Sequence, residues 1–438
     1  MAKIAFLGAG STIFAKNVLG DCMCSEPLKG STIAIYDIDA TRLKDSERML
    51  QNLNGQLQAK MTIKPYLGIA QRRAALKGAQ YVVIAVQIGG YKPSTVIDFR
   101  IPKKYGLQQT IGDTIGIGGI FRTLRTVPVL WEFTRDMEKV CPNAVLMNYS
   151  NPMCMNMMGI LRGSSIRSVG LCHSVDGCAP TLLHHFGMKP ERLQWKVAGI
   201  NHQGWLLEVR DGEKDLYPEI KKACRKAAVR GALPRWDLVR LEIMNRFGYY
   251  ITESSEHTSE YTPWFIKQRY PKLIEQFNIP LDEYPRRCIS QIARWKKMRH
   301  ELVTNKNLTH NRSWEYASYM MEAMETNRPY KFGGNVMNTG LITNLPAKAC
   351  VEVPCIADRS GITPCYIGDL PEQCTALNRT NINPQILTVE ALLTGKKDYV
   401  YQAALLDPHT SAELSIADTI SLCDDLFKAH GKMIPPLK

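Results

Sequence analysis

The sequence predicts an α/β fold in two parts: a Rossmann domain over residues 1–200, followed by a mixed α/β (α+β) domain over 201–438. Three observations support this prediction. An apolar run at 2–8 leads directly into a Gly-x-Gly turn, as in dinucleotide-binding units. Apolar runs then alternate with helical patterns, which is typical of a parallel sheet covered by helices. Beyond residue 205 the pattern changes: residues 215–330 are mainly helical, and β-like runs return at 331–367. We expect the second part to close over a cofactor bound by the first.

The first unit of the chain has the order strand, glycine turn, helix, strand and acid. Gly8-Ala9-Gly10-Ser11 follows the first apolar run, and a helix is expected over 11–24. The next apolar run, at 32–36, ends at Asp37. Glycines let the backbone approach a pyrophosphate at a helix N-terminus, and the acid accepts hydrogen bonds from an adenosine ribose. This order favours NAD⁺ over NADP⁺, although Ile13 replaces the third glycine of the usual motif and an ordinary βαβ turn is the alternative. The residues expected to bind the cofactor are Gly8, Gly10, Ser11, Thr12, Asp37 and Gln87.

Two further glycine-containing segments are candidate binding loops. A strand over 80–86 ends at Gln87-Ile88-Gly89-Gly90, where a Rossmann strand lines the cofactor crevice, with a plain strand exit as the alternative. The glycine-dense segment 112–119 precedes a helix expected over 120–139, and it suits close approach by a phosphate or a substrate. It lacks the Gly-Lys-Ser/Thr ending of a P-loop, so nucleotide hydrolysis is not implied. Asp113 places a carboxylate in this segment, either as a functional group or as an ordinary turn residue.

Neutral amides follow the next predicted strand. The apolar run at 144–147 leads to Asn148 and then to Asn151-Pro152. Amides at the carboxyl end of a strand suit hydrogen bonds to hydroxyl groups, and an Asn-Pro turn is the alternative. Further helices are expected over 41–58, 153–161, 178–187 and 384–430.

One cysteine and two histidines lie at the ends of two later strands. A strand over 167–171 ends at Cys172-His173, and an extended segment over 193–199 ends at Asn201-His202. Thiolate and imidazole groups are strong ligands for divalent metals, and the sites of α/β folds form at strand ends. Cys172 and His202 are therefore candidate metal ligands, with a buried, inert cysteine as the alternative.

The mainly helical region, 215–330, contains a segment of unusual composition. Residues 249–265 combine ionisable, hydroxyl and aromatic side chains, among them Glu256, His257 and Tyr261. General acid–base catalysis needs such groups, with pKa values tuned by burial and by their neighbours. A capped helix start beside a packed Trp is the alternative interpretation.

Composition excludes several classes of protein. The formal charge is +14, but the basic residues form scattered doublets typical of solvated faces, so no nucleic-acid partner is expected. No run of eighteen apolar residues is present, so no membrane span is expected. The N-terminus lacks a signal-peptide pattern, and 13 irregularly spaced cysteines do not indicate a disulfide framework. We expect a reduced, cytoplasmic protein.

Read together, Gly8-Ala9-Gly10-Ser11, Asn151-Pro152, Cys172-His173-Ser174 and Gly199-Ile200-Asn201-His202 resemble the corresponding motifs of glycoside hydrolase family 4. The similarity extends from about residue 3 to the C-terminus, and within the family the bacterial α-galactosidases are most alike. The resemblance implies an NAD⁺- and Mn²⁺-dependent hydrolase of α-galactosides such as melibiose or raffinose. Such an enzyme is an exception to the two-carboxylate rule for glycosidases.

The resemblance also implies an oxidation–elimination mechanism. The sugar is oxidised at C3, loses its acidified C2 proton, and eliminates the aglycone from C1. Water is then added and the C3 ketone is reduced again, which regenerates NAD⁺. A C–H bond beside a ketone polarised by a metal is far more acidic than one beside an alcohol, so cofactor and metal have to share one cleft.

Roles for individual residues follow from the same resemblance. Cys172 and His202 match the Mn²⁺ ligands, although these donor types alone favour a softer metal such as zinc. His173 matches the proton donor for the leaving group, and Asp113 matches a carboxylate that strengthens the base. The C2 base stays open among the candidates Glu256, His257 and Tyr261. The expected substrate contacts are Asn151, Asn148 and Asn201, of which Asn148 can alternatively reach the cofactor.

Other activities stay open at this point. An α-glucosidase, an α-galacturonidase or a 6-phospho-α-glycosidase of the same family is possible, and Arg286-Arg287 offers a phosphate-binding pair. A more distant alternative is a dehydrogenase, because the Rossmann domain is expected to be of the lactate/malate dehydrogenase type. That alternative gives no reason for Cys172-His173. An NAD⁺-binding sensor is the non-enzymatic alternative. Family members form dimers or tetramers, so a homodimer or homotetramer is expected.

Overall fold

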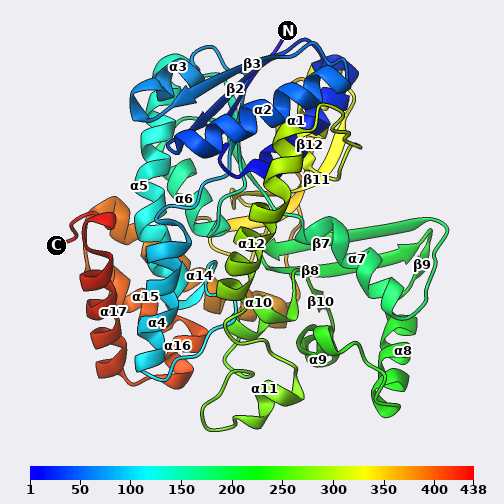
Figure 1. Cartoon of the computed structure of the whole chain (residues 1–438). Helices are drawn as coiled ribbons and strands as arrows, with labels where there is room; N and C mark the ends of the chain where they lie inside the picture. The colour runs from blue at the N-terminus through cyan, green and yellow to red at the C-terminus, as the bar shows by residue number, and fades with distance from the viewer.

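A computed structural model describes all 438 residues, and its central feature is one sheet of 13 strands that runs through both parts of the chain (Figure 1). Its main path has the strand order β10-β8-β7-β12-β11-β6-β5-β4-β1-β2-β3, while β9 pairs with β8 and β13 pairs with β12. Strands β1 to β6 are parallel to their neighbours among these six. The other pairings are antiparallel. The expected fold class is therefore confirmed.

The parallel half has the strand order 3-2-1-4-5-6 of a dinucleotide-binding Rossmann domain. Its strands are β1 (Lys3–Leu7), β2 (Thr32–Asp37), β3 (Thr62–Leu67), β4 (Tyr81–Ile84), β5 (Val145–Asn148) and β6 (Ser168–Leu171). Strand β3 was not predicted, because it is a largely exposed edge strand that contains Lys64 and Pro65. Edge strands tolerate both residue types and need no continuous apolar pattern.

Helices cover the parallel half on both faces, as right-handed crossovers require. They are α1 (Thr12–Cys24), α2 (Ala40–Gln56), α3 (Arg72–Leu76), α4 (Val96–Lys104), α5 (Gly116–Val140), α6 (Met153–Gly163) and α7 (Ser174–His185). The predicted helices at 11–24, 41–58, 120–139 and 153–161 are confirmed. Helix α7 begins at Ser174, four residues before the predicted start, so its first turn directly follows Cys172-His173.

The antiparallel half continues the sheet from β6. Its strands are β7 (Leu193–Ile200), β8 (Gln203–Asp211), β9 (Lys214–Asp215), β10 (Tyr250–Ile251), β11 (Tyr330–Met337), β12 (Cys350–Asp358) and β13 (Gly361–Pro364). The sheet crosses from one half to the other where Gly334 of β11 pairs with Leu171 of β6. Strand β8 was not predicted. Its first four residues are all buried, so they show no alternation of polar and apolar side chains. The division into domains at residue 200 stays a prediction.

The remaining helices surround the antiparallel half and the lower part of the molecule in Figure 1. They are α8 (Tyr217–Val229), α9 (Leu238–Phe247), α10 (Ser255–Glu260), α11 (Lys272–Gln276), α12 (Glu283–Thr304), α13 (Tyr316–Thr326), α14 (Glu372–Thr394), α15 (Asp398–Leu406), α16 (Pro408–Glu413) and α17 (Ile416–His430). The helical C-terminal region is confirmed, and it begins at Glu372 rather than at residue 384.

A buried ion network fixes the last helix to the Rossmann half. Asp98 of α4 accepts two hydrogen bonds from Arg125 of α5, at 3.2 and 2.6 Å. His430 at the end of α17 places its Nε2 2.8 Å from the same carboxylate. Arg125 also donates to the backbone carbonyl of Ile88, in the loop that follows β4. The C-terminal helices therefore support a loop of the expected cofactor crevice.

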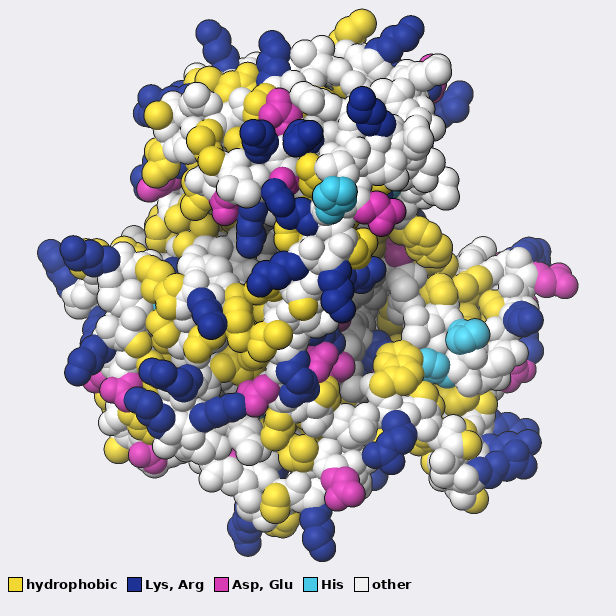
Figure 2. All heavy atoms as spheres, viewed as in Figure 1, with side chains coloured by type: hydrophobic (Ala, Val, Ile, Leu, Met, Phe, Trp, Pro, Cys, Tyr) yellow, Lys and Arg dark blue, Asp and Glu magenta, His cyan; other side chains and the backbone are white.

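The space-filling view shows one hollowed face near the centre of the molecule, between the N-terminal part at the top and the lobe that contains β7 and β8 (Figure 2). Lys and Arg side chains are spread over this face and are not gathered into a single band. No helix in the structure is long and apolar enough to cross a membrane.

Candidate active site

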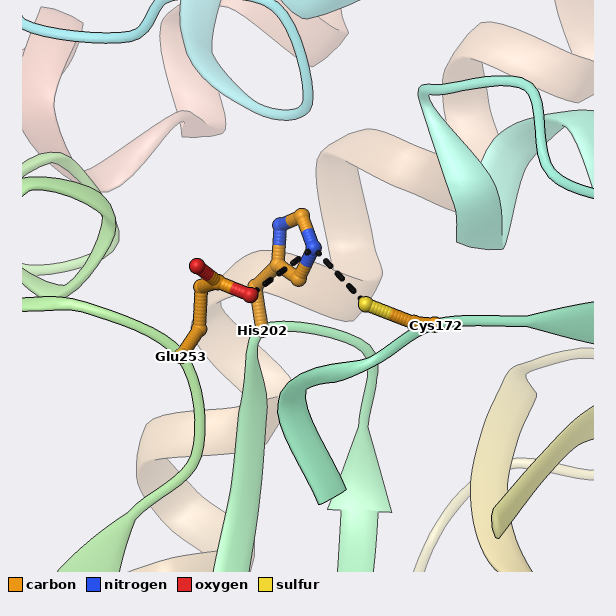
Figure 3. A group of neighbouring side chains, drawn as sticks. All are labelled: Cys172, His202 and Glu253. Carbon is orange, nitrogen blue, oxygen red and sulfur yellow. Dashed lines mark hydrogen bonds and ion pairs between the residues drawn. The ribbon is translucent and has the colours of Figure 1, made fainter. Parts of the chain in front are cut away.

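Three side chains from three separate strand ends converge at the candidate metal centre (Figure 3). Cys172 directly follows β6, His202 lies in the turn between β7 and β8, and Glu253 lies two residues after β10. The Cys172 Sγ lies 3.4 Å from the His202 Nε2, and that nitrogen lies 3.6 Å from the Glu253 Oε2. The ligand atoms of the three residues all lie within 4.8 Å of one another. The structure thus brings the two predicted ligands together and adds Glu253 to them.

The backbone at this centre is held in an uncommon conformation. His202 has φ +64° and Glu253 has φ +67°, both in the left-handed region that residues other than glycine rarely adopt. Such strain persists only where the surrounding structure enforces it, and it concentrates at functional sites. Here it turns both side chains toward Cys172.

The donor set fits a divalent cation. One thiolate, one imidazole nitrogen and one carboxylate oxygen can each supply one ligand atom, and part of the coordination shell stays free for substrate and water. The second ring nitrogen, His202 Nδ1, lies 3.4 Å from Thr114 Oγ1, a contact of the kind that orients a ligating histidine. Burial lowers the pKa of His202, but the charges of Cys172 and Glu253 outweigh it and raise that pKa to about 10. The site therefore has a strong preference for positive charge.

His173 lies beside the metal centre with one ring nitrogen occupied. Its Nε2 lies 2.7 Å from the Glu315 Oε2, and the ring centroids of Tyr316 and Tyr149 lie 6.0 and 6.1 Å from its own. The hydrogen bond to Glu315 raises the pKa of His173 above its ordinary value, against the opposing effect of burial. The side chain is 55% exposed, so a substrate can reach it. Glu315 was not predicted as a site residue.

Two of the candidate bases pack against His202. His257 and Tyr261 are one helical turn apart, and their ring centroids lie 4.4 and 6.4 Å from that of His202. The Tyr261 hydroxyl donates to Thr114 Oγ1 at 3.1 Å, the same oxygen that faces His202 Nδ1. Burial and the neighbouring His202 lower the pKa of His257 to about 3. This face of α10 therefore adjoins the metal centre.

Two glutamates of α10 make contacts away from His202. Glu256 pairs with Arg287 at 3.5 Å, between its Oε1 and the Arg287 Nη2. The buried Glu260 accepts backbone N–H bonds from Thr110, Ile111 and Gly112, at 2.5, 3.2 and 2.9 Å. Burial outweighs these bonds and raises the pKa of Glu260 to about 7. Glu260 thus anchors the glycine-rich segment, while Glu256 is directed to Arg287.

Asp113 lies in the buried interior of the same glycine-rich segment. Arg122 donates to one of its carboxylate oxygens at 3.1 Å, and the other oxygen is buried without a partner. Burial raises the pKa of Asp113, although Arg122 opposes the shift. Arg122 also donates to the backbone carbonyl of Asn151 at 3.2 Å, so it links two predicted site residues.

The N-terminal glycine turn forms a cradle that side chains would fill. A Cβ on Gly8 would lie 2.2 Å from the Ala85 carbonyl oxygen, and Gly8 has φ +95°. A Cβ on Gly10 would lie 2.7 Å from an Asp37 carboxylate oxygen, which instead accepts the Gly10 N–H at 2.6 Å. The Ser11 hydroxyl donates to the Gly8 carbonyl at 2.8 Å. These contacts fit a dinucleotide cradle in which the acid lies beside the backbone of the turn.

The other predicted cofactor residues lie at the same strand ends. The Thr12 hydroxyl donates to the Gly10 carbonyl at 3.3 Å. Gln87 follows β4, and its amide donates to Thr95 Oγ1 at 3.1 Å. Ile13, which stands in place of the third glycine of the motif, is 38% exposed, so it does not obstruct the packing of α1 on the sheet.

Comparison with known proteins decides the family. A model of the family 4 glycosyl hydrolases matches residues 3–188, and a model of their C-terminal domain matches residues 197–410. The chain belongs to glycosyl hydrolase family 4. It is 59% identical to an α-galactosidase of Bacillus subtilis over 438 residues, which covers 100% of both chains. It is 33% identical to an α-galactosidase of Rhizobium meliloti, over 99% of this chain and 89% of that one.

Solved structures of the family have the same fold. A 6-phospho-α-glucosidase from gut microorganisms, crystallised with NAD and Mn²⁺, superposes with a TM-score of 0.81 at 21% identity, over 100% of both chains. A malate dehydrogenase of Plasmodium falciparum superposes with a TM-score of 0.53 at 13% identity, over 91% of this chain. The likeness to the dehydrogenase is in the fold alone.

Two predicted substrate contacts of this family 4 chain are held within the protein. Asn201 is buried and donates to Glu352 Oε1 at 3.2 Å. Asn148 is also buried, and its amide exchanges hydrogen bonds of 3.1 Å with the backbone of Ser150. Asn151 is half-buried and its side chain makes no such bond to the protein. Of the three, Asn151 is the one whose amide is free for a ligand, and contact of the other two with substrate stays a prediction.

Several residues of the site were missed from the sequence. Glu253 lies within the predicted segment 249–265, but nothing in its neighbours distinguishes it from Glu256 or Glu260. Glu315 lies 142 residues from His173 along the chain, and only the fold brings the two together. Thr114 lies in the glycine-rich segment, where a hydroxyl next to Asp113 was the sole available signal.

Proposed function

We propose that this family 4 enzyme is an NAD⁺- and Mn²⁺-dependent α-galactosidase. The observation that carries the proposal is the convergence of Cys172, His202 and Glu253 on the sheet whose other strand ends form the dinucleotide cradle. The similarity to the two α-galactosidases, over nearly the whole chain, supports the sugar specificity. A dehydrogenase of the lactate/malate type, which works without a metal, has no use for such a donor set.

The dinucleotide and the metal would each be held by a separate set of residues. Gly8, Gly10 and Asp37 would hold the dinucleotide at the N-terminus of α1, where backbone N–H groups favour pyrophosphate. Cys172, His202 and Glu253 would hold the metal. The carboxylate makes this donor set harder than the Cys–His pair, and carboxylate oxygen suits Mn²⁺. When bound, NAD⁺ supplies the oxidant for the sugar C3 and Mn²⁺ supplies a Lewis acid at the neighbouring oxygens.

His173 acts on the leaving group in this proposal. It directly follows the ligand Cys172, it is accessible, and one of its ring nitrogens is unbonded within the protein. Elimination from C1 places negative charge on the aglycone oxygen, and a proton delivered there in the transition state lowers the barrier. His173 is the group that delivers this proton.

The C2 base comes from the His257/Tyr261 face of α10. Both rings adjoin His202, so either residue lies beside the place where the metal would polarise the sugar. Glu256 is instead paired with Arg287. Asp113, with one buried oxygen unpaired, supplies negative charge on the same side of the site. Asn151 is positioned to bind a sugar hydroxyl.

The charges around Arg287 support a neutral sugar as substrate. Arg287 lies 3.0 Å from Glu283 and 3.5 Å from Glu256, so two carboxylates already surround the guanidinium that a phosphate or uronate would need. Arg286 is paired with Glu283 as well, at 2.8 Å. An anionic sugar would have to displace these carboxylates, whereas a galactoside would not.

We also propose a homodimer or homotetramer in the cytoplasm. Of the 22 residues of α12, only Cys288 and Val303 are buried, and the exposed ones include Ile289 and Ile292. A second copy of the chain that covers α12 would remove this apolar surface from water. All 13 cysteines are free, and a ligating thiolate persists in a reducing compartment. Sedimentation of the purified enzyme tests the assembly.

A substrate panel tests the activity. The protein is assayed with NAD⁺, Mn²⁺ and a thiol reductant on p-nitrophenyl α- and β-glycosides, including uronides and 6-phosphates. We expect hydrolysis of the α-galactoside, dependence on both NAD⁺ and Mn²⁺, and no net accumulation of NADH. Absence of α-galactoside hydrolysis would overturn the sugar assignment. Stoichiometric formation of NADH would indicate a dehydrogenase.

A further inference from the structure

The ring of His173 is held by a hydrogen bond at one edge and lies near two tyrosine rings. Glu315 contacts the Nε2 edge at 2.7 Å, and the ring centroids of Tyr149 and Tyr316 lie 6.1 and 6.0 Å from that of His173. No other hydrogen bond to the protein forms at this ring. An exposed histidine without such contacts would rotate freely about its side-chain bonds. The ring therefore has one preferred orientation, with Nδ1 as its unbonded nitrogen.

The Glu315 carboxylate sets this orientation. The backbone that carries Glu315 is itself held by α1, the helix that follows the glycine turn. Asp21 of α1 is fully buried and accepts hydrogen bonds from the Ser313 N–H and hydroxyl, at 2.7 and 2.6 Å. His310 Nε2 lies 2.5 Å from the same carboxylate. The Ser313 hydroxyl oxygen in turn accepts the backbone N–H of Glu315 at 3.3 Å. Glu315 is thus tied to α1 through Ser313, which lies two residues before it in the sequence.

We propose that Glu315 is a positioning residue that makes His173 Nδ1 the proton-donating atom for the departing aglycone. This assignment rests on the proposed α-galactosidase function. During elimination the C1–O bond breaks and its electron pair passes to the aglycone oxygen. The proton on Nδ1 moves to that oxygen, while the electrons from the broken C2–H bond form the C1=C2 bond. The Nε2–H stays hydrogen-bonded to Glu315 throughout. A proton donor works only within hydrogen-bond reach of its acceptor, so loss of the orientation would remove most of its benefit.

A leaving-group comparison separates this role from a merely structural one. The aglycone of melibiose is a sugar alkoxide and needs the proton, whereas p-nitrophenolate is a stable anion and does not. For Glu315→Ala we expect kcat on melibiose to fall about 100-fold and kcat on p-nitrophenyl α-galactoside to fall less than about threefold. Glu315→Gln should lie between Glu315→Ala and the wild type on melibiose, since its amide oxygen still accepts the Nε2–H.

Two controls complete the experiment. Glu325→Gln alters a glutamate near the far end of α13, where it accepts a 2.7 Å bond from Tyr81, and the substrate ratio should not change. In a His173→Ala background, Glu315→Ala should cause no further loss of kcat on melibiose, because both substitutions remove the same proton donation. Equal losses on the two substrates, or an additive loss in the double variant, would overturn the role of Glu315. An unchanged ratio in an active enzyme contradicts this role alone, whereas a wild type inactive on both substrates contradicts the proposed function.

Discussion

The Cys172 Sγ lies 3.4 Å from the His202 Nε2, although the two residues are 30 positions apart in the sequence and come from opposite halves of the sheet. Cys172 ends the last parallel strand, and His202 lies in a hairpin of the antiparallel half. The antiparallel strands β11 and β12 lie between β6 and β7 in the sheet. The metal centre therefore depends on the joining of the two halves into one sheet.

Glu253 should contribute to metal affinity. We expect Glu253→Gln to weaken Mn²⁺ binding about 10- to 100-fold, because one charged oxygen donor is lost while Cys172 and His202 remain. Titration of the NAD⁺-loaded protein with Mn²⁺, followed by electron paramagnetic resonance, measures the change. Glu256→Gln is the matched control in the same segment, and it should bind Mn²⁺ like the wild type. Equal affinity of the Glu253 variant and the wild type would show that Glu253 is not a ligand.

Oxidation of Cys172 should inactivate the enzyme reversibly. A thiol oxidised to the sulfenic acid or a mixed disulfide no longer supplies a thiolate ligand, and reductant restores it. Cys172 is half-buried, whereas most of the other cysteines are buried. We expect parallel loss of activity and of Mn²⁺ binding in air, with recovery of both after dithiothreitol. Mass spectrometry identifies the modified residue, and modification elsewhere with Cys172 intact would contradict this account.

The base assignment distinguishes His257 and Tyr261 from Glu256. We expect Tyr261→Phe or His257→Gln to slow exchange of the sugar C2 proton about 100-fold or more, since a general base contributes on this scale. Glu256→Gln should slow it less than about tenfold, because Glu256 is paired with Arg287. Solvent deuterium incorporation at C2, followed by NMR, is the measurement. Normal exchange in both the Tyr261 and the His257 variant, with none in the Glu256 variant, would identify Glu256 as the base.

The carboxylates around Arg287 should control the tolerance for anionic sugars. Replacing Glu256 by Gln leaves Arg287 paired with Glu283 alone, so we expect kcat/KM for an α-galactoside 6-phosphate, relative to the unphosphorylated substrate, to rise about tenfold. Glu242→Gln removes a comparable partner of the exposed Arg246 and should leave the ratio unchanged. A ratio that does not respond to Glu256→Gln would show that Arg287 does not face the sugar.

Sequence patterns predicted the parts of the fold that repeat a regular motif. The Rossmann order was evident because most of the parallel strands are short apolar runs, the first two of which end beside Gly8 and Asp37. Strand β3 was missed because it is exposed at the sheet edge. Strand β8 was missed because its buried start shows no alternation. Both failures reflect the place of the strand in the assembled sheet, which sets its burial and which a local sequence pattern does not reveal.

Prediction of the site was limited in the same way. Cys172 and His202 were found because each directly follows a recognisable strand. Glu253 and Glu315 were not found, because their importance arises from contacts made by the fold over 51 and 142 residues. Asn201 looked available from its position in the motif, yet Glu352 of β12 holds its amide in the core.

The central claim is that the sugar is cleaved by oxidation and elimination at one shared metal and cofactor site. Its most direct test is hydrolysis of an unlabelled α-galactoside in D₂O with NAD⁺ and Mn²⁺, with the galactose product analysed by NMR. We predict deuterium at C2 of the released galactose and no net NADH. Complete retention of the C2 proton during efficient hydrolysis would contradict this account and indicate direct displacement at C1.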